Sequence, residues 1–141
     1  MIFTEPKNAA TPLPLFESFE AEQDLCVNGQ DFLNIIYNAN SFKAITFTCD
    51  TRLLENCTHL ITAKLVGSIP KENKTKIKLC SNVHTKLYIL DTNEIWVGSM
   101  NLRNGNMLHE LMIRVDKKDS QASALRLYWK SLWTVACSQT H

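Results

Sequence analysis

The chain has 141 residues, and 15 basic against 14 acidic residues leave a formal net charge of +1. This length predicts one domain with a real hydrophobic core, and the apolar content of 45% is ordinary for a soluble protein. No apolar stretch approaches the roughly 20 residues that span a bilayer, and the start lacks the apolar core of a signal peptide. The five cysteines form no Cys-x-x-Cys pair. We therefore expect a cytoplasmic protein with reduced cysteines, no zinc site and no membrane anchor.

The sequence of the first half of the chain indicates an irregular arm followed by alternating strands and helices. Residues 1–15 contain three of the four prolines and are expected to form an irregular arm, so that the folded domain covers 16–141. The elements that follow are expected to be a strand over 25–28, a helix over 30–39, a strand over 42–48 and a helix over 52–65. Asp50 is well placed to cap the second of these helices.

The second half predicts most of the sheet and one long helix. The expected elements are a loop over 67–75, strands over 76–80, 83–90 and 95–99, a loop over 103–108, a strand over 110–115 and a helix capped by Asp119 or Ser120. Apolar residues recur in that helix at the spacing of a buried face, namely Leu125, Tyr128, Trp129, Leu132, Trp133 and Ala136. They are expected to pack in the core or against a dimer partner. Together these elements predict an α/β fold, a mixed β-sheet flanked by helices in a single compact domain.

The stretch 84–101 carries the pattern His-x-Lys-x4-Asp-x6-Gly-Ser-x-Asn. Four polar residues in its middle form the expected turn of an antiparallel hairpin. If the turn is centred in that group, His84 lies opposite Asn101 and shares its face of the hairpin. Lys86 then lies opposite Ser99 on the same face. An imidazole, an ammonium, a hydroxyl and a carboxamide would form one cluster, which suits a phosphodiester.

This pattern resembles that of the phospholipase D superfamily, in particular its small nuclease-like members with one motif per chain. The residues that carry the resemblance are His84, Lys86, Asp91, Gly98, Ser99 and Asn101. Glu110 is similar to a glutamate that the family commonly places at the start of the next strand. Two features depart from the pattern. Arg103 and Leu108 stand where many members carry Thr and Asn, and the interval before the motif is short, with room for one helix and one strand.

The resemblance implies phosphodiester hydrolysis through a phosphohistidine, without a metal or another cofactor. His84 would be the nucleophile, and Lys86 and Asn101 would hold the phosphoryl oxygens. Ser99 would assist, and Glu110 would orient His84 through its second ring nitrogen. The motif aspartate at the turn would act mainly as a structural and electrostatic support.

This mechanism needs a second histidine, whereas the chain carries one copy of the motif. We therefore expect a homodimer, in which a two-fold axis brings two copies of His84 together. One copy would act as the nucleophile and the other as the general acid. His109 is an alternative acid, although its place beside Glu110 predicts that it points away from the site.

Charge is unevenly distributed along the chain. Residues 1–60 hold eight acids and three bases, a net −5, and residues 61–141 hold twelve bases and six acids, a net +6. The basic part includes Lys76 and Lys78, which together with Arg103 are the expected substrate-binding residues. A polyanion fits this surface, so the first hypothesis is a nuclease that acts on DNA, or on RNA. The alternatives are a lipid phosphodiesterase and a nucleic-acid-binding module without catalysis.

Overall fold

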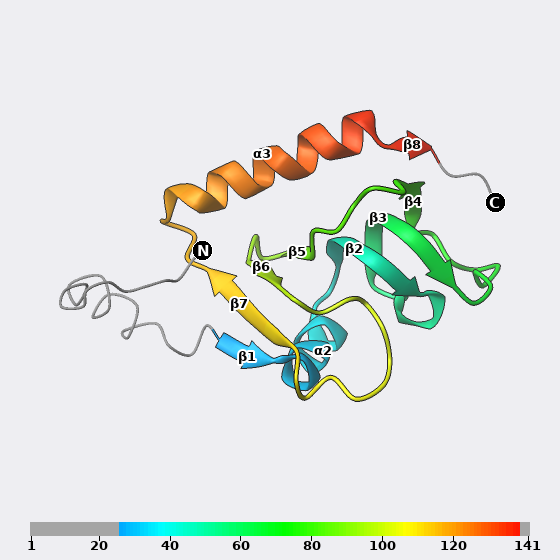
Figure 1. The fold of residues 1–141 in the computed structure, drawn as a ribbon, viewed down its shortest axis with the longest axis horizontal. Coiled ribbons are helices and arrows are strands. Elements are labelled where there is room, and N and C mark those ends of the chain that lie inside the picture. Colours follow the sequence, from blue (N-terminus) through cyan, green and yellow to red (C-terminus); the bar gives the residue numbers. More distant parts are fainter. Residues whose placement is uncertain (1–25, 139–141) are drawn as a thin grey trace.

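The fold is built on one mixed β-sheet, seen in a computed structural model that describes residues 26–138 (Figure 1). The arm expected over 1–15 lies outside the described residues. The strands are β1 (Cys26–Asn28), β2 (Phe42–Asp50), β3 (Cys57–Val66), β4 (Lys76–Leu79), β5 (Leu87–Leu90), β6 (Ile95–Gly98), β7 (Leu111–Val115) and β8 (Cys137–Ser138). Their order in the sheet is β1-β7-β6-β5-β2-β3-β4-β8. β2, β3 and β4 run parallel to each other, and the other neighbouring strands are antiparallel.

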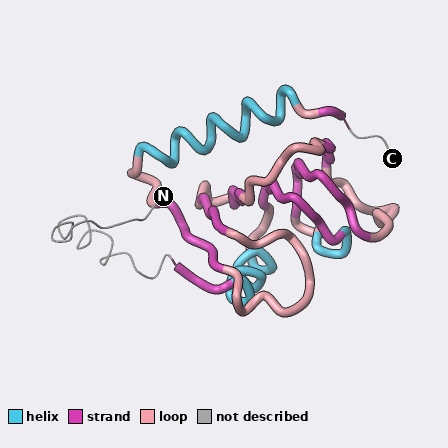
Figure 2. Tube along the Cα trace, in the orientation of Figure 1, coloured by secondary structure: helices cyan, strands magenta, loops and turns pink. Residues whose placement is uncertain are grey.

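Two helices, α2 (Gly29–Asn38) and α3 (Ser120–Val135), pack on opposite faces of the sheet (Figure 2). Phe32 of α2 packs with Ala44 of β2, whereas Trp129 of α3 packs with the next residue of that strand, Ile45. Neighbouring strand residues point to opposite faces, so the two helices bury separate clusters. This arrangement confirms the predicted α/β fold with helices flanking a mixed sheet. No helix in the described part of the chain is long and apolar enough to cross a bilayer.

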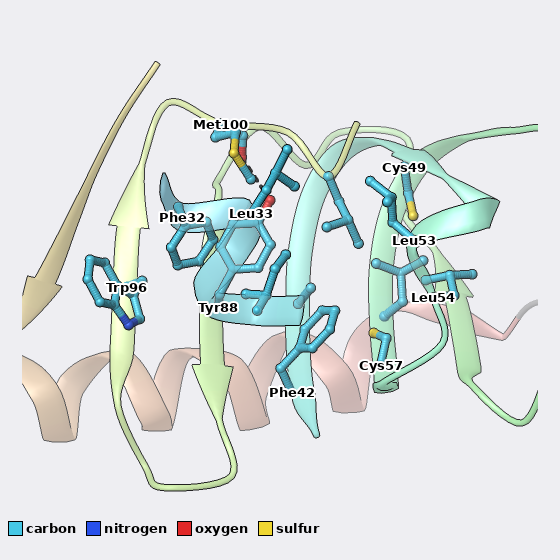
Figure 3. Close-up of a cluster of buried hydrophobic side chains, with 14 of the residues drawn as sticks. Phe32, Leu33, Phe42, Cys49, Leu53, Leu54, Cys57, Tyr88, Trp96 and Met100 are labelled. Atoms are coloured by element: carbon cyan, nitrogen blue, oxygen red, sulfur yellow. Dashed lines mark hydrogen bonds between the residues drawn. The ribbon is translucent and has the colours of Figure 1, made fainter. Parts of the chain in front are cut away.

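The cluster under α2 is centred on aromatic rings (Figure 3). The Phe32 ring centroid lies 4.9 Å from that of Tyr88 and 5.2 Å from that of Trp96. The buried Tyr88 hydroxyl donates a hydrogen bond of 2.8 Å to the Met100 carbonyl. Burial raises the pKa of Tyr88 well above its ordinary value, so this phenol remains a donor. The bond fastens the segment after β6 to the core.

Both helices begin where a side-chain cap satisfies their first free N–H groups. Asn28 Oδ1 accepts from the Asp31 N–H at 2.8 Å, and Asp119 accepts from the Gln121 N–H at 2.9 Å. The predicted helix over 30–39 and the Asp119 cap are therefore confirmed. Within the predicted stripe on α3, Trp129 and Ala136 are buried, whereas Tyr128 is 40% exposed.

The predicted helix over 52–65 is wrong. Asp50 does cap a helix, but this is the single 3-10 turn η2 (Thr51–Leu53), and the chain then enters β3. β3 is hydrogen-bonded on both sides, to β2 and to β4. Its β-branched residues, among them Ile61 and Thr62, suit a strand. These long-range pairings outweigh the local helical preference, so two strands precede the motif instead of a helix and a strand.

The hairpin register differs by one residue from the prediction. β5 and β6 pair Leu87 with Val97, and a bond of 3.4 Å from the Gly98 N–H to the Lys86 carbonyl places Lys86 beside Gly98 instead of Ser99. The reason is the turn, in which Asn93 adopts a φ of 68°. This left-handed residue closes a three-residue loop, whereas a two-residue loop would give the predicted register. The expected cross-strand pairs, His84 with Asn101 and Lys86 with Ser99, are therefore not formed.

Candidate active site

The motif lies at the edge of the sheet where β2 ends and β5 begins. His84 and Lys86 belong to the segment before β5, and Asn101 follows β6. A bond of 2.8 Å from the Asp50 N–H to the Leu102 carbonyl holds the segment after β6 against the end of β2. The loops before β5 and after β6 therefore meet over the last residues of β2.

Asn101 is fixed by its carboxamide oxygen. Oδ1 accepts from the Thr46 hydroxyl at 2.9 Å, the Phe47 N–H at 3.0 Å and the Thr48 N–H at 3.2 Å. Because two of these donors are backbone groups, the oxygen must face β2 and the amide cannot be turned over. Nδ2 then points away from the strand, where it has no hydrogen-bond partner within residues 26–138. The side chain presents a fixed N–H donor at the surface.

The end of β2 departs from regular strand geometry to make this contact. Successive N–H groups of a strand point in opposite directions, yet those of Phe47 and Thr48 reach one oxygen. The fully buried Thr46 hydroxyl accepts from the Leu102 N–H at 3.1 Å. Its single proton goes either to Asn101 Oδ1 or to the Thr48 carbonyl, each at 2.9 Å. Sequence reasoning missed Thr46, because a threonine in a β-branched strand carries no distinctive signal.

His84 is exposed, and its ring lies flat against an aromatic neighbour. The centroids of the His84 and Phe47 rings are 5.2 Å apart, with 9° between their planes. The same Phe47 donates its N–H to Asn101. Phe47 therefore links the candidate nucleophile and the candidate phosphate-binding amide. No sequence pattern singles out this phenylalanine.

Glu110 and Ser99 form a hydrogen-bonded pair. The Ser99 hydroxyl donates to Glu110 Oε1 at 2.6 Å and accepts from the Leu111 N–H at 3.0 Å. The Ser99 N–H in turn donates to the Leu111 carbonyl at 3.0 Å. The sequence predicted that Glu110 orients His84, but among the described residues its side-chain hydrogen bond goes to Ser99. Glu110, which directly precedes β7, thus positions the Ser99 side chain at the end of β6.

Gly98 allows this close approach between β6 and β7. A Cβ atom at this position would overlap the Leu111 carbonyl oxygen and lie 2.7 Å from Met112 Sδ. Any other residue would push the two strands apart, and with them Ser99 from Glu110. The glycine of the motif therefore serves packing and needs no unusual backbone angle.

Asp91 lies apart from the other motif residues. It is exposed in the hairpin turn, at the opposite end of β5 from Lys86. Its N–H donates to the Ser41 carbonyl at 3.0 Å, and its carboxylate accepts from Asn40 Nδ2 at 3.5 Å. These contacts tie the turn to the segment before β2.

The three predicted substrate-binding residues lie in different places. Arg103 is exposed two residues after Asn101, near enough to Asp50 to help lower the pKa of that carboxyl, an effect that is due mainly to Arg52. Lys76 and Lys78 lie on β4, three strands from β5. Lys78 Nζ donates to the Trp133 carbonyl at 2.7 Å, which ties this lysine to α3.

A nearer lysine is Lys64, which belongs to the basic part of the sequence but is not among the expected substrate-binding residues. Lys64 is exposed and pairs in register with Thr48, whose N–H binds Asn101. It therefore lies one strand away from the candidate site.

Two buried thiols lie in the central strands, Cys49 near the end of β2 and Cys57 at the start of β3. Burial, helped by the charge of Asp50, raises the pKa of Cys49 to about 12. Burial also raises the pKa of Cys57 well above its ordinary value. Both are free thiols that stay protonated at neutral pH, so neither competes with His84 as a nucleophile.

The fold resembles two solved structures of bacterial proteins. One is Nuc from Salmonella typhimurium, a phospholipase D family member, with a TM-score of 0.56 and 14% identity over 82% of this chain and 97% of that chain. The other is NucT from Helicobacter pylori, with a TM-score of 0.54 and 14% identity over 88% of this chain and 94% of that chain. No protein-family model matches the sequence, and neither does any curated protein. At this identity, the likeness establishes a phospholipase D-like fold.

Proposed function

Given this phospholipase D-like fold, we propose that the chain is a metal-independent phosphodiesterase, a nuclease that cleaves DNA. The observation that carries the proposal is the junction at Phe47, whose ring stacks on His84 and whose N–H binds Asn101. The end of β2 thereby supports both a nucleophile and an amide donor. If a phosphodiester bound between them, His84 would attack its phosphorus and the Asn101 amide would stabilise the charge on its oxygens.

The proposed reaction has two displacement steps at phosphorus. A ring nitrogen of His84 attacks, so that a P–N bond forms and the bond to the leaving oxygen breaks. The leaving oxygen takes a proton from His84 of the partner subunit. Water then attacks phosphorus, the P–N bond breaks, and the proton of the water returns to that second histidine. Throughout, Lys86 and the Nδ2 amide of Asn101 neutralise the non-bridging oxygens.

The proposed site is formed across a homodimer. His84 and Ser99 are both exposed, so they are open to a second copy of the chain. An isologous interface would place the two histidines on opposite sides of one phosphodiester. Mixing the wild type with His84→Ala tests this. Activity should fall as the square of the wild-type fraction after subunit exchange, whereas a linear fall would contradict a shared site.

Nucleic acid is the proposed substrate because cations border the site. Lys64 and Arg103 are exposed near Asn101, and neither forms an ion pair within the described residues. Such side chains suit a repeating phosphate backbone and give binding that weakens with salt.

A lipid phosphodiester is the second candidate, and one observation favours it. Leu108 and Leu111 are 57% and 50% exposed, next to Ser99 and Glu110. Apolar side chains at the rim of a site can contact acyl chains. Release of a headgroup from phospholipid vesicles, with no cleavage of nucleic acid, would favour this candidate.

The direct test is incubation of the protein with single-stranded and plasmid DNA in excess EDTA. Wild-type protein should cleave and His84→Ala should not. His109→Ala is the matched control, since it removes an exposed histidine one residue from Glu110. It should cleave like the wild type, and its loss of activity would transfer the acid role to His109. Cleavage by His84→Ala, or cleavage that EDTA abolishes, would contradict the proposal.

A further inference from the structure

A second group of basic side chains lies in a row across the parallel part of the sheet. In β2, β3 and β4, Lys43 pairs with His59 and His59 pairs with Lys76. Paired residues of neighbouring strands share a face, so the three side chains are adjacent. We call them the Lys43–His59–Lys76 row.

The Lys43–His59–Lys76 row lies beside α3, on the face of the sheet that this helix covers. Two residues farther along β2 and β3, Ile45 and Ile61 are fully buried in the cluster that contains Trp129 of α3. His59 is half-buried and meets Trp133 of α3 edge-on, with the ring centroids 5.1 Å apart. The helix thus covers the middle of this sheet face and leaves the row open beside it.

Positive charge in the row has no acidic partner among the described residues. Neither Lys43, His59 nor Lys76 forms an ion pair within residues 26–138. The pKa of His59 is lowered, first by burial and then by Lys43 and Lys76. With its pKa lowered, His59 is neutral at pH 7, so the row carries the charges of its two lysines. A bound anion relieves the repulsion between them. Lys78 adds a further cation, with Nζ 4.6 Å from the centroid of the Trp133 ring.

The row and the candidate active site flank the same helix. Thr85, next to His84, shares a hydrogen bond of 3.1 Å with the Tyr128 hydroxyl of α3, whereas the row meets Trp133. Five residues of helix turn through about 140° net at 3.6 residues per turn, so these contacts lie on different sides of α3. β2 passes beneath α3. Lys43 lies on one side of the helix, and Phe47, which stacks on His84, lies on the other side.

We propose that the Lys43–His59–Lys76 row is a second phosphate-binding site, which holds a polynucleotide on the far side of α3 from His84. This inference rests on the proposed nuclease function. Four residues along β2 and two strands across the sheet give a separation of about 16 Å. Along a strand with stacked bases, at about 3.4 Å per nucleotide, on the order of five phosphates separate the two sites. A short oligonucleotide should therefore be unable to occupy both sites at once, whereas a longer one should bridge them.

The test measures salt-dependent binding of single-stranded DNA to the full-length His84→Ala protein, which cannot cleave it. Lys43→Gln/Lys76→Gln should lower the slope of log affinity against log salt by about 1.4, at about 0.7 for each phosphate that is no longer neutralised. This decrease is expected for a 20-nucleotide strand and not for a 4-nucleotide strand. The control is Lys117→Gln/Lys118→Gln, which removes two exposed lysines from the loop before α3.

Each outcome has a distinct meaning. An unchanged slope in Lys43→Gln/Lys76→Gln, or an equal decrease in the control, overturns the second site and leaves the nuclease proposal standing. An equal decrease with both lengths of DNA overturns the separation of the two sites. No binding and no cleavage by the wild type overturns the nuclease proposal, and this inference with it.

Discussion

The Thr46 hydroxyl is a buried group on which both stability and the candidate site depend, and Thr46→Val removes it with little change in shape. Valine offers no acceptor to the Leu102 N–H and no donor to Asn101 Oδ1. A buried N–H without a partner costs about 1–3 kcal/mol, and each lost hydrogen bond about 1 kcal/mol. We expect the free energy of unfolding to fall by about 2–4 kcal/mol, measured by urea denaturation.

The effect on activity should be smaller than the effect on stability. Asn101 Oδ1 keeps its two backbone donors in Thr46→Val, so the amide becomes looser but stays in place. We expect kcat/KM for DNA cleavage to fall about tenfold, which corresponds to about 1.4 kcal/mol. Thr46→Ser retains the hydroxyl and should restore most of both quantities. A valine variant within about 0.5 kcal/mol of the wild type, or a serine variant no better than valine, would refute the reasoning.

The same geometry leads to three further predictions. Gly98→Ala should lower the free energy of unfolding by about 1–3 kcal/mol, since its Cβ meets the Leu111 carbonyl; an unchanged thermal midpoint would contradict this close packing. Asn101→Asp can accept the same backbone bonds but lacks the Nδ2 donor and adds negative charge, so kcat/KM should fall by about two orders of magnitude with the circular dichroism spectrum kept. The pKa of His59 is lowered by burial and by Lys43 and Lys76, so the unfolded chain binds the proton more readily and stability should fall as the pH drops below about 6.5. His59→Gln should flatten that dependence in urea denaturation between about pH 5 and pH 7, and an equal slope in both proteins would show that another group is responsible.

Local patterns in the sequence predicted the helices and most strands because their signals are short-range. The apolar stripe of α2 and the Asp119 cap of α3 can be read within one or two helical turns. β3 could not be read in this way, since its identity depends on pairing with β2 and β4. The hairpin shows a finer limit. Asn93, a single residue in the left-handed conformation, lengthens the turn by one residue. The register of every pair between β5 and β6 shifts as a result.

The candidate site also has a part that the sequence predicts and a part that it does not. The motif residues could be named from their spacing, but the contacts that hold them could not. Thr46 and Phe47 are distant in sequence from Asn101 and His84, and only the irregular end of β2 brings them together. Likewise, the partner of Glu110 is the Ser99 hydroxyl, a choice set by the close packing that Gly98 permits.

β2 is the strand at which the sheet changes from parallel to antiparallel pairing. The antiparallel side carries the groups proposed to break the bond, and the parallel side carries the row proposed to grip the polymer. The loop over 67–75 joins two strands of the parallel side and contacts none of the motif residues through the hydrogen bonds of the described chain. Because Lys76 directly follows this loop, a change in the loop would alter the proposed row while the motif residues stay the same. A scaffold divided in this way can diversify its targets by changing one side alone.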